Sequence, residues 1–391
     1  MKRGSAMLEP TPRSVLDASS RHEGNPLVLA TAAVVSEHGA GFVLKEIDVP
    51  DPGPFDIRVR ICAVGICHTD VSVAGGHRNV PTPIVLGHEG AGIVEVVGSA
   101  VTSVAPGDHV ALSFASCGEC AACDTGHPAL CPSSLALNFG GTPPLGTPSL
   151  RLPDGSALHG SFFGQSSFAT HALVREKAVV KIPVDFPFEL AAPLGCSVQT
   201  GAGAVWRNVN VNPGDTVVVN GVGAVGMSAV MAAAASGAKH IIAVDVTPSR
   251  LDAALDVGAT RTIDGRTEDF GEVVRQLTPA GADAVIDTTA VPSVVEKSLE
   301  ALRLGGILAM VASGRGDDSI RLSKLLGKRV VGVMEGDSVP SQSIPQLIAM
   351  QQSGRFPLEK LITTYPFESI AEAIDDMKAG KAIKPVLVMP D

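Results

Sequence analysis

Basic residues, aromatic residues and long apolar runs are all scarce in this sequence. Its 30 Lys and Arg stand against 40 Asp and Glu, a formal net charge of −10 that argues against nucleic acid or an anionic membrane surface as a partner. No apolar run approaches the roughly 18 residues that cross a bilayer, and residues 1–26 are too polar for a secretory signal. We therefore expect a cytoplasmic protein whose partners are small molecules.

Two regions with different sequence patterns follow a polar extension, which we place at residues 1–29. Up to Pro187, short β-type segments alternate with Gly and Pro, which is typical of a barrel-like or sandwich-like β domain; examples are 57–64, 91–97 and 109–114. From Pro213 onward, β and α segments alternate, and this pattern predicts a parallel sheet with crossover helices. We expect strands at 216–220, 241–244, 283–288, 306–311 and 385–388, and helices at 227–235, 250–255, 294–302, 344–352 and 370–377.

A glycine-rich turn follows the first predicted strand of the second region, which begins at Pro213. Gly221, Gly223 and Gly226 form a GxGxxG motif, which lets the backbone approach a pyrophosphate at a helix N-terminus. Asp245 ends the next predicted strand and can accept hydrogen bonds from an adenosine ribose, so NAD is favoured over NADP. Arg250 would be a second ribose contact or a solvated helix residue, and it leaves room for some use of NADP. A purely structural turn is the alternative for the whole motif.

Four of the seven cysteines crowd into one short segment. Cys117, Cys120, Cys123 and Cys131 can close a tetrahedral zinc site with no open position, which would make the site structural. Reduced thiols are expected without a secretory signal, so metal is favoured over disulfides. An iron–sulfur cluster or a redox relay is the alternative.

A second set of metal ligands is dispersed along the chain. Cys67, His88 and Cys196 offer two thiolates and an imidazole, and they would leave a fourth position open for water or substrate, as catalytic zinc requires. Spacing alone does not single them out, because a lone cysteine is usually a packing residue and a histidine can be a satisfied core residue.

Taken in chain order, these motifs resemble a known family, the zinc-dependent medium-chain alcohol dehydrogenases. The resemblance covers about residues 30–391 and is carried by the segments GICHTD (65–70), GHEGAG (87–92), the four-cysteine loop, GC (195–196) and the GxGxxG turn. It implies an α/β protein with a GroES-like, β-rich catalytic domain at 30–197 and 335–391. A Rossmann NAD-binding domain with a doubly wound parallel sheet would occupy 198–334, and the active site would lie in the cleft between the two. Within the family, segments 162–170 and 335–340 resemble the aryl-alcohol (benzyl alcohol) dehydrogenase branch.

The resemblance also implies roles for individual residues. The catalytic set comprises the zinc ligands Cys67, His88 and Cys196, the neighbouring acid Glu89, the histidine-orienting Asp70 and the proton-accepting Thr69. The cofactor set adds Thr200 and Val225 near the nicotinamide and the basic residues His68 and Lys384 at the pyrophosphate. Ser72 stands where many members carry a histidine that passes the proton to solvent, so the relay would end at Thr69 and the cofactor ribose or use water.

These features together predict a dehydrogenase with two zinc ions per chain that oxidises primary alcohols to aldehydes with NAD, reversibly. Phe162 and Phe163, with Ser113 nearby, match pocket-lining positions, and aromatic walls suit flat aryl or allylic alcohols. The alternative is that the phenylalanines are core residues. The resemblance implies a homodimer or homotetramer. The rival functions are a polyol or glutathione–formaldehyde adduct dehydrogenase, a zinc-free quinone or enoyl reductase, and a non-enzymatic NAD-binding protein.

Overall fold

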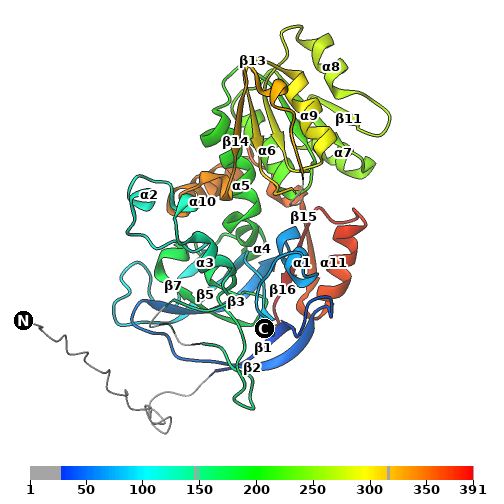
Figure 1. The fold of residues 1–391 in the computed structure, drawn as a ribbon. Helices are drawn as coiled ribbons and strands as arrows, with labels where there is room; N and C mark the ends of the chain where they lie inside the picture. Colours follow the sequence, from blue (N-terminus) through cyan, green and yellow to red (C-terminus); the bar gives the residue numbers. More distant parts are fainter. Residues whose placement is uncertain (1–27, 145–146, 148, 315–317, 391) are drawn as a thin grey trace, which may run out of the picture.

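The protein folds into two lobes, with helix α5 (Ser197–Gly203) lying between them (Figure 1). The computed structural model describes residues 28–144, 147, 149–314 and 318–390. The predicted polar extension lies outside these ranges except for its last two residues, which belong to strand β1 (Val28–Val35). No helix in the described ranges is long and apolar enough to cross a membrane.

The first lobe is built around strand β3 (Asp56–Gly65), whose residues are almost all buried. On one edge β3 pairs with β5 (Gly90–Val97), and on the other its first half pairs with β7 (His171–Arg175) and its last residues with β16 (Lys384–Val388). The sheet runs β15-β16-β3-β5-β6-β8 and is completed by β6 (His109–Leu112), β8 (Val179–Lys181) and β15 (Ile362–Pro366). A small sheet of β2 (Val43–Val49), β1 and β4 (Ile84–Val85) adjoins it. The C-terminal segment therefore returns to the first lobe.

The second lobe contains a six-stranded, all-parallel sheet. Its order is β11-β10-β9-β12-β13-β14, so the chain starts in the middle of the sheet and winds outward in both directions. The strands are β9 (Thr216–Asn220), β10 (His240–Asp245), β11 (Arg261–Asp264), β12 (Ala282–Asp287), β13 (Leu302–Met310) and β14 (Arg329–Gly332). The predicted combination of a β-rich domain with a doubly wound parallel sheet is confirmed.

Helices cover both faces of the parallel sheet. Val217 and Val219 of β9 pack in the cluster that contains α6 (Ala224–Ala235), whereas Val218 packs in the cluster that contains α8 (Phe270–Leu277) and α9 (Pro292–Ala301). Successive side chains of a strand point to opposite faces, so a strand buried on both sides is a continuous apolar run. The remaining long helices are α7 (Pro248–Asp256), α10 (Pro340–Gln352) and α11 (Ile370–Lys378).

Every strand and helix predicted from the sequence has a counterpart within a few residues, but several elements were missed. Strands β11, β14 and β15 lie at sheet edges, where most of their residues are partly or fully exposed. An edge strand therefore lacks the apolar run that reveals a central one. Helix α8 was also missed, although Asp269 caps it by accepting hydrogen bonds from the N–H groups of Gly271 and Glu272.

Glycine allows α5 to approach both lobes closely. A Cβ added to Gly201 would lie 2.1 Å from the carbonyl oxygen of Val225 in α6, and one added to Gly203 would lie 2.3 Å from that of Gly336. Any larger residue at these positions would push α5 away from its neighbours, so the close packing of this helix depends on the two glycines.

The close pairing of β3 and β5 gives a test of the fold. A Cβ at Gly92 would lie 2.0 Å from the carbonyl oxygen of Arg60, so Gly92→Ala is expected to force the strands apart and destabilise the protein by about 1–3 kcal/mol. Gly332→Ala in β14 is the matched control, because no atom lies within 4 Å of the added methyl group. Thermal unfolding followed by circular dichroism measures both variants. An unchanged melting temperature for Gly92→Ala would contradict this account of the sheet.

Candidate metal and active site

Three segments that are distant in the sequence bring Cys67, His88 and Cys196 together. Cys67 follows β3 and caps helix α1 (His68–Ala74), His88 precedes β5, and Cys196 precedes α5. Together with Glu89, one potential ligand atom from each residue lies within 4.8 Å of the others. The Nε2 atom of His88 is buried and has no hydrogen-bond partner in the described part of the chain. Two sulfur atoms and an imidazole nitrogen that is available to a metal form a set of ligands that suits zinc.

Asp70 fixes the orientation of the histidine ring. Its Oδ1 atom lies 2.9 Å from Nδ1 of His88, and the same carboxylate accepts hydrogen bonds from the backbone N–H groups of Cys67 and Gly87. With its proton on Nδ1, the ring presents the Nε2 lone pair to the cysteines. Asp70 thus contacts the imidazole directly, and the histidine-orienting role that the resemblance implies for it stays a prediction.

The pKa values of the two thiols of the cluster shift in opposite directions. A hydrogen bond between the sulfurs lowers the pKa of Cys67 well below its ordinary value and raises the pKa of Cys196 well above its ordinary value. The positive charge of Lys384, and that of His88 when its ring is protonated on both nitrogens, also favour the Cys67 thiolate. Since thiolates are the metal-binding form, a metal ion that binds here displaces protons.

Lys384 forms a buried ion pair with Glu89. Its ammonium donates to Oε2 of Glu89 at 2.7 Å and to the carbonyl oxygen of Ile66 at 2.9 Å, while Oε1 of Glu89 accepts from the N–H of Ser197. Burial raises the pKa of the Glu89 carboxyl in spite of the lysine. The lysine is therefore engaged beside the metal ligands, and its expected contact with a pyrophosphate stays a prediction.

Sequence reasoning gave no role to Glu335, whose carboxylate also reaches this cluster. It accepts a hydrogen bond from the hydroxyl of Thr200 at 3.5 Å. Burial raises the pKa of the carboxyl to about 7, and a hydrogen bond with the Cys196 thiol opposes the shift. Glu335 lies in the segment 335–340 that suggested the aryl-alcohol branch, but nothing in its local sequence indicates that it faces Cys196.

Two phenylalanines border the histidine. The ring of Phe163 stacks on that of His88 with 4.4 Å between centroids, and Phe162 meets His88 edge to face at 5.5 Å. Both side chains are buried, so they are core residues that also form a wall beside the candidate metal site. Ser113, also expected in the pocket, is buried and donates to the carbonyl oxygen of Gly195, so it supports the turn before Cys196.

The other residues expected around the catalytic site lie in α1 next to Cys67. Thr69 is half-buried, whereas His68 is exposed to solvent. Ser72 is half-buried one turn further along the helix.

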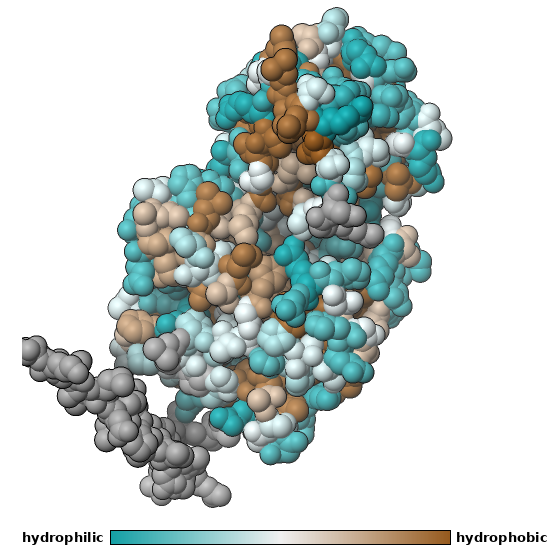
Figure 2. Space-filling model, viewed as in Figure 1, coloured by the Kyte–Doolittle hydropathy of each residue, from teal (hydrophilic) through white to brown (hydrophobic). Residues whose placement is uncertain are grey.

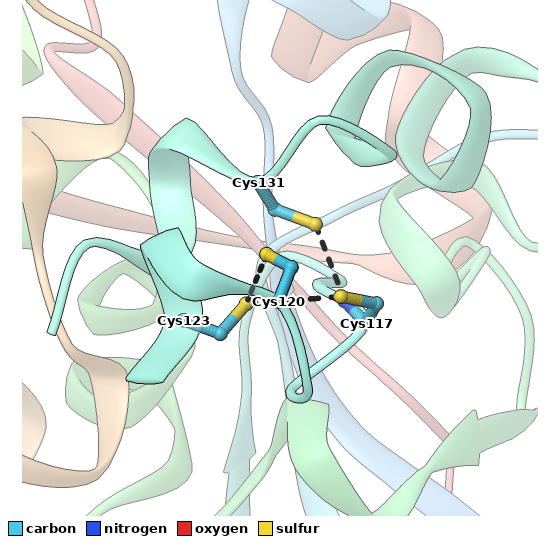
Figure 3. A group of neighbouring side chains, drawn as sticks. All are labelled: Cys117, Cys120, Cys123 and Cys131. Carbon is cyan, nitrogen blue, oxygen red and sulfur yellow. Dashed lines mark hydrogen bonds between the residues drawn. The ribbon is translucent and has the colours of Figure 1, made fainter. Parts of the chain in front are cut away.

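The four-cysteine loop forms a separate cluster, in which all four side chains turn toward one centre (Figure 3). The sulfurs of Cys120 and Cys123 are 3.6 Å apart, and those of Cys117 and Cys123 are 4.0 Å apart. Hydrogen bonds from backbone N–H groups, chiefly that of Glu119, lower the pKa of Cys117 to about 7. None of the seven cysteines, which all lie within the described residues, forms a disulfide bond. Four thiolates around one point fit a closed zinc site.

The glycine turn connects β9 to α6 as expected for a pyrophosphate site. Gly221 has a φ of 79°, and a Cβ at Gly226 would lie 1.9 Å from the carbonyl oxygen of Gly221. Nothing lies within 4 Å of a Cβ at Gly223, which precedes the first residues of α6 and leaves their N–H groups accessible. Val225 follows in the first turn of α6.

Asp245 at the end of β10 faces the same turn. Its carboxylate accepts hydrogen bonds from the N–H groups of Val222 and Thr247, and Arg250 lies 4.0 Å away. The separation between Arg250 and Asp245 is at the distance limit of an ion pair, so Arg250 compensates the negative charge of Asp245 only weakly.

Comparisons with known proteins cover both lobes. The family model for an alcohol dehydrogenase GroES-like domain matches residues 53–184, and the model for a zinc-binding dehydrogenase matches residues 224–353. The chain is 40% identical over 366 residues to the geraniol dehydrogenase of Castellaniella defragrans, covering 92% of this chain and 98% of that one.

Two crystal structures are similar over nearly the whole chain. The alcohol dehydrogenase zinc-binding domain protein from Burkholderia ambifaria has a TM-score of 0.91 at 43% identity and covers 94% of this chain and 100% of its own. The benzyl alcohol dehydrogenase from Acinetobacter calcoaceticus has a TM-score of 0.89 at 39% identity, with 93% and 100% covered.

Metal analysis tests the two clusters separately. The wild-type protein is expected to hold about two zinc ions per chain, because there are two clusters. Cys196→Ser should lose one of them and all turnover while keeping its circular dichroism spectrum, and Cys131→Ser should lose the other and melt at lower temperature. Cys62→Ser, outside both clusters, is the control. Full zinc content and full activity in Cys196→Ser would refute the assignment of the catalytic site.

Proposed function

The chain belongs to the zinc-dependent medium-chain alcohol dehydrogenases, and from this premise we propose that it oxidises primary aryl or allylic alcohols to aldehydes with NAD, in a reversible reaction. Two similar proteins are named for geraniol and benzyl alcohol, an allylic and an aryl alcohol. The same class of substrate follows from the aromatic wall beside His88.

The observation that carries the substrate proposal is the stacking of Phe163 on His88. Phe162, Phe163 and Phe139 form an edge-to-face group whose rings lie 5.0 to 5.8 Å apart. A flat apolar alcohol gains from such a wall, whereas a polyol would lose hydrogen bonds to water there. The glutathione–formaldehyde adduct is anionic, and Lys384 beside the cluster is already paired with Glu89.

Each residue of the site has a part in the proposed reaction. Cys67, His88 and Cys196 would hold the zinc, and Asp70 would keep the imidazole in its metal-binding orientation. Bound zinc would acidify the alcohol, and a bound nicotinamide would accept the hydride. The hydroxyl of Thr69 would accept the alcohol proton and pass it to water or the cofactor ribose, because Ser72 offers no imidazole.

The cofactor proposal rests on the β9–α6 turn and Asp245. The turn would hold the pyrophosphate against α6, with Thr200 and Val225 near the nicotinamide. Asp245 would bind the ribose hydroxyls and repel a 2′-phosphate, so NAD is preferred to NADP. Free thiols at both clusters suit a reducing compartment, and the cytoplasm is the proposed location.

Substrate and cofactor preference can be measured together by following NADH or NADPH formation. Benzyl alcohol and geraniol should be oxidised with a kcat/KM at least about tenfold above ethanol, sorbitol and a glutathione–formaldehyde mixture, and NAD should outperform NADP by about tenfold. Phe163→Ala removes the stacked ring and should reduce the preference for benzyl alcohol over ethanol, whereas Phe163→Leu should retain part of it. Activity restricted to sorbitol or the glutathione mixture would overturn the substrate class.

We also infer that the protein forms a homodimer or homotetramer through β14. This strand ends the parallel sheet and leaves an edge free to pair with a second copy. Figure 2 shows apolar side chains gathered at this end of the second lobe. Leu304, Leu322 and Leu326 around this edge are 78%, 80% and 84% exposed, which is unusual for leucines on a monomer.

Light scattering after size-exclusion chromatography tests this interface. Leu326→Asp would place a charge in the centre of the apolar contact and is expected to halve the molecular mass or raise the dimer dissociation constant by about a hundredfold or more. Val184→Asp, at a valine that is 75% exposed on the first lobe, is the control and should leave the mass unchanged. A wild-type mass equal to one chain would exclude the interface.

A further inference from the structure

Residues 288–290, which we call the β12 loop because they follow that strand, pack against the glycine turn. The hydroxyl of Thr288 donates a bifurcated hydrogen bond to the carbonyl oxygens of Gly221, at 2.8 Å, and Asn220, at 3.0 Å. A Cβ added to Gly221 would lie 2.5 Å from the hydroxyl oxygen of Thr288 and 2.9 Å from the methyl carbon of Thr289. The β12 loop and the turn are therefore in direct contact.

This contact lies where the winding of the parallel sheet reverses. Strand β9 has β10 on one side and β12 on the other, and Asp287 at the end of β12 lies opposite Asn220 at the end of β9. In doubly wound sheets, ligands bind outside the carboxyl ends of the strands at this switch point. The β12 loop is thus placed to support one side of the turn that would hold the pyrophosphate.

The carboxylate of Asp287 holds the β12 loop by hydrogen bonds. Its Oδ1 atom accepts from the N–H groups of Ala290 at 2.7 Å and Thr289 at 3.1 Å, and its Oδ2 atom accepts from the Thr289 hydroxyl at 3.1 Å. The side chain is fully buried. Burial raises the pKa of the carboxyl, and the hydrogen bonds from Ala290 and Thr289 oppose the shift. These bonds require an acceptor oxygen at this position, which a neutral amide also supplies.

The backbone of Ala290 needs such support. Its φ is 50°, in the left-handed region that suits glycine and is unfavourable for residues with a Cβ. The bond from its N–H group to Asp287 is shorter than the bonds from Thr289 to the same carboxylate. Asp287 therefore stabilises the bend that carries Thr288 and Thr289 to the glycine turn.

Building on the proposed function, we propose that Asp287 is a positioning residue of the dinucleotide site. Its carboxylate fixes the β12 loop, the loop holds Thr288 against Gly221, and Gly221 sets the path of the turn on which the pyrophosphate would lie. Loss of the carboxylate should therefore weaken binding of the dinucleotide while both zinc clusters, which lie on other elements, keep their metal.

NADH fluorescence titration measures the dissociation constant without turnover. Asp287→Ala removes both acceptor oxygens and should raise the Kd for NADH by about tenfold or more, whereas Asp287→Asn keeps one acceptor and should raise it by about threefold or less. Zinc content should equal that of the wild type in both variants. An NADH Kd for Asp287→Ala equal to that of the wild type would overturn the proposal.

Asp56→Ala is the matched control. Asp56 is also fully buried and also accepts hydrogen bonds from a backbone N–H group, that of Gly53, and a threonine hydroxyl, that of Thr147, but it lies at the start of β3 in the first lobe. Both alanine variants should melt at a lower temperature, and only Asp287→Ala should lose affinity for NADH. An equal loss of affinity in the two would mean general destabilisation and would refute the positioning role.

Substitutions at Ala290 test the same mechanism with the carboxylate in place. Ala290→Val puts a β-branched residue at a left-handed position and should raise the Kd for NADH by about fivefold or more. Adding Ala290→Gly to Asp287→Ala should recover at least about threefold of the lost affinity, because glycine adopts this conformation without support. An unchanged Kd in Ala290→Val, or no recovery in the double variant, would contradict the proposal.

Steady-state kinetics and the wild-type titration separate this inference from the proposed function. With benzyl alcohol, Asp287→Asn and Ala290→Val should raise the KM for NAD more than they lower kcat. If the wild type binds NADH and the variants bind it equally well, only the role of Asp287 is wrong. If the wild type binds NADPH more tightly, the cofactor preference is wrong, and the same variants compared with NADPH decide the role of Asp287. If it binds neither, the cofactor proposal fails and this inference fails with it.

Discussion

The buried ion pair between Glu89 and Lys384 is the interaction on which the candidate catalytic site most depends. Both side chains are almost fully buried, at 0% and 3% exposure. Loss of either partner would leave an uncompensated charge inside the protein, at a cost of about 3–5 kcal/mol. Since Lys384 begins β16 and Glu89 follows the candidate metal ligand His88, the pair is formed only when the C-terminal strand has joined the first sheet. The site is therefore assembled by segments from opposite ends of the chain.

Close backbone approaches impose the second constraint on the same region. A Cβ at Gly65 would lie 2.0 Å from a carboxylate oxygen of Glu89, and one at Gly195 would lie 1.8 Å from the carbonyl oxygen of Leu112. These glycines lie close in sequence to the two candidate cysteine ligands, Cys67 and Cys196. They let the strands and α5 come near enough for sulfur, nitrogen and carboxylate atoms to meet around one point.

The sequence predicts local features well and distant ones poorly, for a physical reason. Four cysteines within one loop, a GxGxxG turn and the apolar runs of β9 or β12 depend on neighbours in the chain, so spacing reveals them. The set of Cys67, His88 and Cys196 depends on how the sheet folds, and only the resemblance to a family singled it out. Two contacts were missed: the pairing of Lys384 with Glu89 and the approach of Glu335 to Cys196. The spacing of residues along the chain indicates neither of them.

The two clusters are connected through the loop that carries Glu335. His127 lies between Cys123 and Cys131 in the four-cysteine loop, and it is bonded to Asp337, two residues after Glu335. Arg207 reinforces the connection by donating to the carbonyl oxygen of Gly126 at 2.8 Å while it lies 3.7 Å from Asp337. A metal ion held by four thiolates makes its loop rigid without offering an open position for chemistry. A metal ion bound there would thus contribute to the candidate catalytic site indirectly, by fixing the position of the loop that carries Glu335.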